Sequence, residues 1–114
     1  MEKTIDKEIE YLRIGLLTLY LLKRIERLPK VSMDPFHALL KSEAEKHLGA
    51  GGSLVYSRLH TLAEEGFLKT ALGQSSNPKA KKPVRVYFLT DSGKKLIRQL
   101  EKEKARIEGS LEHA

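Results

Sequence analysis

Residues 49–68 of this 114-residue chain read GAGGSLVYSRLHTLAEEGFL. Three glycines among the first four residues favour a tight turn, and Ser53 is a residue type that often caps helix N-termini. Apolar residues then recur at helical spacing, and the predicted helix continues to about Glu65. Gly66 is typical of the position that follows a helix. The pattern predicts a short glycine-rich turn and then a helix over residues 53–65.

The apolar residues of this predicted helix share one narrow arc. Val55, Leu59 and Leu62 face the same way at helical spacing, so we expect them in a core. The polar residues then point outward, and Arg58, on a flank, has the alternative of pairing with an acid such as Glu65. The outward face is a candidate DNA-binding surface with six residues: Ser53, Tyr56, Ser57, Arg58, His60 and Thr61.

Another helix is predicted before the glycine turn. Asp34 followed by Pro35 is a typical helix start, because aspartate caps free amides and proline suits the first helical position. Apolar residues recur on one face as far as Leu48, and Gly49 ends the helix. Two strands are expected next, over residues 67–72 and 84–89, so a helix-turn-helix leads into a β-hairpin.

The hairpin has a basic tip. Residues 73–83 combine turn-forming glycine, serine, asparagine and proline with lysines, which are rarely buried. A merely solvated basic loop is the alternative, because charge runs are commonly just exposed. We expect the hairpin to contact phosphate or the minor groove through four cations: Lys79, Lys81, Lys82 and Arg85.

The positive charge of the chain is concentrated in its C-terminal part. Residues 1–65 carry 10 Lys+Arg against 10 Asp+Glu, whereas residues 66–114 carry 11 against 5, so the whole excess of +6 lies in the second part. No acid occurs between Glu65 and Asp91. A concentrated positive surface attracts polyanions, most simply the phosphates of nucleic acid.

The two terminal helices are predicted to pair subunits. Thr4 is expected to cap a first helix that runs to about Arg27, and Thr90 or Asp91 a last helix with heptad-like apolar spacing. The first helix has two apolar stripes. The core of a chain this small can cover one stripe, so we expect a second copy of the chain to cover the other. The predicted dimer interface comprises Ile5, Ile9, Leu12, Leu16, Leu100, Ile107 and Leu111.

Several classes of function are disfavoured. The chain has no cysteine, which excludes disulfides, zinc ribbons and thiolate nucleophiles. The histidines lack metal-ligand spacing, and the glycine turn lacks the ending of a phosphate-binding loop, so we expect no metal, no cofactor and no enzyme. No secretion signal or apolar run of about 20 residues is present, which favours a cytoplasmic protein without a membrane partner.

Three segments resemble the PadR-like transcriptional regulators: residues 52–56 (GSLVY), 58–68 (RLHTLAEEGFL) and 86–93 (VYFLTDSG). The Leu-Thr-x-x-Gly exit from the hairpin is shared with MarR-like and other winged-helix regulators. The predicted first helix is longer than the PadR pattern, and residues 34–39 match it only loosely. The resemblance covers residues 36–100 and implies dimers that bind near-palindromic operators, often with the terminal helices as the interface.

The sequence thus predicts a mainly α-helical winged helix-turn-helix with a small β-hairpin and long terminal helices that form a dimer interface. We expect one domain over residues 1–114, with an N-terminal helix (1–28), helix-turn-helix and wing (34–89) and a C-terminal dimerisation helix (90–112). The expected function is sequence-specific binding of double-stranded DNA by a homodimeric transcriptional regulator, most simply a repressor. The alternative is a winged-helix protein-interaction or assembly module whose basic hairpin meets an acidic partner.

Overall fold

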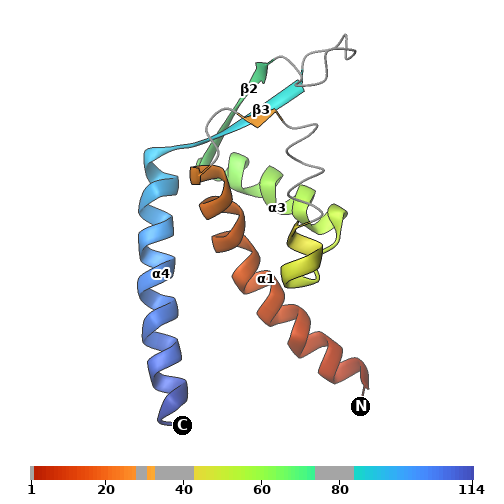
Figure 1. The fold of residues 1–114 in the computed structure, drawn as a ribbon, viewed down its shortest axis with the longest axis vertical. Helices are drawn as coiled ribbons and strands as arrows, with labels where there is room; N and C mark the ends of the chain where they lie inside the picture. Colours follow the sequence, from red (N-terminus) through yellow and green to blue (C-terminus); the bar gives the residue numbers. More distant parts are fainter. Residues whose placement is uncertain (1, 28–30, 33–42, 74–83) are drawn as a thin grey trace.

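The fold is mainly helical, with one small sheet at the end of the molecule where α1 and α4 meet (Figure 1). The structure, a computed structural model, describes residues 2–27, 31–32, 43–73 and 84–114, which span about 54 × 34 × 21 Å. The order and type of the elements confirm the predicted winged helix-turn-helix. The elements are α1 (Glu2–Arg27), β1 (Val31–Ser32), a helical segment over residues 43–48, α3 (Gly52–Glu64), β2 (Leu68–Gly73), β3 (Val84–Leu89) and α4 (Asp91–Glu112).

The sheet has three strands in the order β1-β3-β2, and both pairings are antiparallel. Leu68 pairs with Leu89 and Gly73 with Val84, so β2 and β3 form the expected hairpin around residues 74–83. Sequence reasoning placed the first of these strands at 67–72, one residue early. It also missed β1, because two residues are too few to show the alternation that marks a strand.

The core lies where α1 crosses α3. Leu17 and Leu21 of α1 are fully buried, as are Val55 and Leu59 of α3, and burial of each such side chain contributes about 1.5–3 kcal/mol. Ile25 of α1 is also in this core, so one of the two predicted α1 stripes packs inside the subunit as expected. α1 starts at Glu2, and Thr4 therefore lies inside the helix rather than capping it.

The N-cap of α3, the helix after the glycine turn, differs from the one predicted. Gly49 has a positive φ of 68°, which glycine adopts without steric cost, and it ends the helical segment as expected. α3 begins at Gly52, and Gly51, extended at φ −72° and ψ 163°, is its N-cap. Ser53 is thus the second residue of α3 and not its cap, because the extended backbone needed at a cap is supplied two residues earlier.

The start of α4 is fastened to the end of α3. Thr90, one of the two predicted caps, is the N-cap of α4, and its hydroxyl accepts from the Gly93 N–H at 3.0 Å and donates to the Gly66 carbonyl at 2.7 Å. The Thr90 N–H donates to the Phe67 carbonyl at 3.2 Å. These bonds explain the Leu-Thr-x-x-Gly sequence, in which threonine caps and glycine lets α4 approach the Phe67 backbone.

Candidate nucleic-acid interface

The outward face of α3 is polar and accessible. Val55, Leu59 and Leu62 are buried, which confirms the inward arc read from the sequence. Among the predicted DNA-binding residues, Thr61 is half-buried and four others are exposed: Ser53, Tyr56, Ser57 and His60. The sixth predicted residue of α3, Arg58, is half-buried and contacts α1.

Arg58 is directed toward α1. Its Nη2 donates to the Thr18 hydroxyl at 2.7 Å, the side chain is half-buried, and no ion pair with Glu65 is found. The Nε atom of Arg58 is buried and has no hydrogen-bond partner among the described residues. A guanidinium held in this way fastens α3 to α1, while the predicted contact between Arg58 and DNA stays a prediction.

His60 has a partner on its own helix. Its Nε2 lies within ion-pair distance of the Glu64 carboxylate, one turn further along α3, and both side chains are exposed. A protonated imidazole would be attracted to this carboxylate, and a neutral one can still donate a hydrogen bond to it. Contact between His60 Nε2 and a base therefore requires the His60–Glu64 pair to open.

The basic hairpin lies partly outside the described residues. Lys79, Lys81 and Lys82 fall among residues 74–83, which the structure does not describe. The backbone of Arg85 is in β3, opposite Leu72, but its side chain is likewise not described. On the described part of the hairpin, the Lys69 ammonium lies 6.0 Å from the centre of the Phe88 ring, at the outer limit of a cation–π contact.

An apolar groove of about 430 Å³ separates α1 from α4. It brings together five of the seven residues predicted from the two ends of the chain to form a dimer interface: Leu12, Leu16, Leu100, Ile107 and Leu111. Tyr11 and Leu19 of α1 also line the groove and were not among those predicted. The sequence pattern includes Leu19 in the same stripe, at spacing three from Leu16, although the predicted interface omitted it.

The other two predicted interface residues, Ile5 and Ile9, are exposed on α1, at 55% and 48%. Leu12 and Leu111 are each 66% exposed, whereas Leu19 is only 9% exposed, so the N-terminal part of the α1 stripe is left uncovered by the subunit itself. An ion pair between Lys23 Nζ and Glu101 Oε1, at 3.1 Å, joins the same two helices. Figure 1 shows α4 on one side of α1, and α3 with residues 43–48 on the other.

A cluster of polar groups holds residues 43–48 on α1. The Glu43 carboxylate accepts from the Tyr20 hydroxyl at 3.3 Å and pairs with Arg24 Nη2 at 2.9 Å. Burial, followed by the nearby Glu43 charge, raises the pKa of Tyr20 above its ordinary value, so its hydroxyl stays protonated at neutral pH and can donate. These contacts join α1 to residues 43–48 within one subunit.

Among the described residues, no group of three His, Asp or Glu side chains is arranged to hold a metal ion. None of the helices within those ranges is both long and apolar enough to cross a membrane.

Comparison with known proteins identifies the fold through solved structures. No family model matches the chain, and no curated protein matches it. A PadR family transcriptional regulator from Eggerthella lenta is 20% identical, with a TM-score of 0.74, over 98% of this chain and 92% of that one. A PadR-like transcription factor from Bacteroides fragilis is 19% identical, with a TM-score of 0.67, over 91% and 94%.

A PadR family transcription regulator from Clostridium difficile R20291 is 11% identical, with a TM-score of 0.68, over 85% of this chain and 95% of that one. All three are described as transcription regulators and none as an enzyme. In each case the similarity covers at least 85% of this chain and at least 92% of the other. The chain therefore has the winged-helix fold of the PadR-like transcriptional regulators.

Proposed function

We propose that the protein is a homodimeric, sequence-specific DNA-binding transcriptional regulator that represses by occupying a promoter. The observation that carries this proposal is the accessible polar face of α3 in a PadR-like fold, on the side of α1 away from the apolar groove. Two such faces on a twofold assembly would enter successive major grooves of one duplex. A cytoplasmic location follows from this role.

A second copy of the chain is the proposed occupant of the groove. The groove walls are apolar, and the same subunit exposes a matching apolar stripe that includes Ile5 and Ile9. A twofold interface requires such self-complementarity, because each partner offers the stripe and the groove at once. Charged residues of both signs, Glu103, Lys104 and Glu108, also line the groove, where Lys104 pairs with Glu108 and Glu103 with Arg106 along α4.

In this dimer Ser57, His60 and Thr61 would meet base edges, with Ser53 and Tyr56 beside them. Lys79, Lys81, Lys82 and Arg85 would neutralise phosphates with little sequence preference. Selection of bound duplexes from a random pool tests the whole proposal. Recovery of a near-palindrome with half-sites about one helical turn apart is the expected result, and recovery of no preferred sequence would contradict it.

The wing contribution is tested by Lys81→Glu combined with Lys82→Glu. We expect affinity for every duplex to fall by at least about tenfold near 0.1 M salt, and the salt dependence to flatten by about 0.9 for each phosphate that is no longer neutralised. Fluorescence anisotropy at several salt concentrations measures both. Lys3→Glu with Lys7→Glu is the control, since it changes the net charge equally in the first turns of α1, outside the hairpin.

The α3 contribution is tested by Thr61→Ala. The substitution should change which duplex is selected and lower discrimination at one base position by about tenfold, while affinity for unrelated duplexes stays within about twofold. Competition binding with single-base variants of the selected duplex measures this. Thr4→Ala, at an exposed position of α1, is the control. Equal losses on all duplexes would place Thr61 outside the base-reading set.

A further inference from the structure

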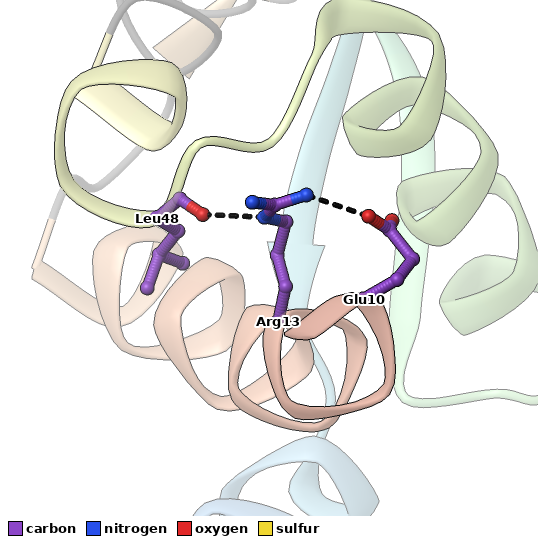
Figure 2. Close-up of polar contacts among 3 residues, drawn as sticks. All are labelled: Glu10, Arg13 and Leu48. Carbon is purple, nitrogen blue, oxygen red and sulfur yellow. Dashed lines mark hydrogen bonds and ion pairs between the residues drawn. The ribbon is translucent and has the colours of Figure 1, made fainter. Parts of the chain in front are cut away.

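Arg13 of α1 holds the carboxyl end of the helical segment 43–48. Its Nε donates to the Leu48 carbonyl at 2.8 Å, and its Nη1 pairs with Glu10 Oε2 at 2.6 Å (Figure 2). Leu48 is 35 residues away in the chain, so this bond joins α1 to the turn that precedes α3. The Arg13 side chain is 28% exposed, so most of its surface is shielded from water.

This contact adds to the backbone hydrogen bonds of the turn itself, which include Ala50 N–H to the Ala44 carbonyl at 3.2 Å. The last carbonyls of a helix have no partner within it, and a cation at that end is favoured by the helix dipole. Here the Gly49 N–H closes onto the Glu45 carbonyl at 2.9 Å, and the Leu48 carbonyl receives Arg13 instead. The guanidinium lies so close to Gly49 that a Cβ there would be 3.1 Å from Nη2.

Arg13 and the groove occupy adjoining faces of one helix. Leu12 and Leu16 line the groove between α1 and α4, whereas Arg13 reaches the turn and Thr18 accepts from Arg58 of α3. One face of α1 is thus proposed to pair the subunits. Another part of α1 contacts the helix-turn-helix at two points, the Leu48 carbonyl and Arg58. α3 begins three residues after Gly49, so the contact between Arg13 and the Leu48 carbonyl lies close to the N-terminal end of α3.

We propose that Arg13, oriented by Glu10, is a positioning residue for DNA recognition, which sets the direction of α3 relative to α1. This inference rests on the proposed DNA-binding function. With Arg13 in place, both copies of α3 are held at one angle, and base contacts form in register at both half-sites. Without it, α3 is looser at its N-terminal end, while cations elsewhere still bind phosphate, so base discrimination falls and non-specific binding remains.

Arg13→Met tests this, because methionine keeps much of the apolar stem and removes the guanidinium. The fold should survive, since Tyr20 and Arg24 still hold Glu43. We expect the affinity ratio between the selected duplex and a scrambled one to fall about tenfold, with affinity for the scrambled duplex changed less than about twofold. Glu10→Ala should lower the same ratio by about threefold, because it only frees the guanidinium.

Arg106→Met is the matched control. Arg106 forms the same type of i,i+3 pair with Glu103 on α4, and its substitution removes the same charge without touching the turn. Hydrogen exchange of the amides of residues 49–55 provides a second measurement, and it should be faster in Arg13→Met and unchanged in Arg106→Met.

The two proposals fail separately. A wild-type protein that prefers no duplex would overturn the proposed function. A wild-type preference that persists in both Arg13→Met and Glu10→Ala would overturn only the role of Arg13. Parallel losses on selected and scrambled duplexes would also overturn it, because they would show general destabilisation.

Discussion

Replacing Gly93 with alanine should lower the free energy of unfolding by about 2 kcal/mol. A Cβ at this position would lie 2.3 Å from the Phe67 carbonyl oxygen and 2.7 Å from Leu89 Cδ1. The carbonyl is backbone and already accepts from the Thr90 N–H, so it has little freedom to retreat. Alanine gains up to about 1 kcal/mol over glycine inside a helix, but the clash outweighs this gain.

Gly109→Ala in the same helix is the control for this prediction. A Cβ there meets nothing within 4 Å, so only the helix-propensity term remains, and stability should rise by about 0.5–1 kcal/mol. Urea unfolding of both variants, at one fixed protein concentration, measures the difference. Equal stabilities for the two variants would show that α4 does not approach the Phe67 backbone this closely.

Combining Leu12→Glu with Ile107→Glu should convert a dimer into a monomer of 12.9 kDa and weaken operator binding by at least about 100-fold. Both side chains are more than half exposed in the subunit and line the groove between α1 and α4. Two carboxylates per subunit would then be buried in apolar surroundings if the dimer formed. The weaker binding reflects the absence of a second, tethered half-site.

Sedimentation equilibrium measures the mass, and far-UV circular dichroism checks that the helices persist. Leu72→Glu is the control for oligomeric state, since Leu72 is 76% exposed on β2, outside the groove. A double variant that sediments like the wild type would contradict the proposed interface. A wild-type protein that is itself monomeric would do the same, while leaving the assignment of α3 and the wing to be tested on DNA.

Much of this architecture was predictable because it is local. The arc of Val55, Leu59 and Leu62, the threonine cap at Thr90 and the stop at Gly49 all follow from helical periodicity and backbone chemistry within a few residues. Errors were also local: Ser53 has the right chemistry for a cap, but a nearby glycine supplies the required backbone. The two-residue β1 strand showed no periodicity, since its pairing with β3 is what defines it.

The candidate binding surfaces were also predictable only in part. Sequence reasoning found the exposed stripe of α1, because an amphipathic pattern shows which residues a small core cannot cover. It could not tell that Arg58, on the flank of α3, would turn toward Thr18, 40 residues earlier in the chain. Helical periodicity gives the side of a helix on which a residue lies, but not the neighbour that it meets there.

By itself, the sequence determined the order of the helices and of the two hairpin strands, the faces of the helices and the placement of excess positive charge, since these depend on neighbouring residues and on composition. Only the tertiary structure decided that Leu12 and Ile107 share one groove, that Arg13 meets the Leu48 carbonyl and that Gly93 lies against Phe67. Such contacts join segments far apart in the chain, and they exist only once α1 has packed against the rest of the subunit.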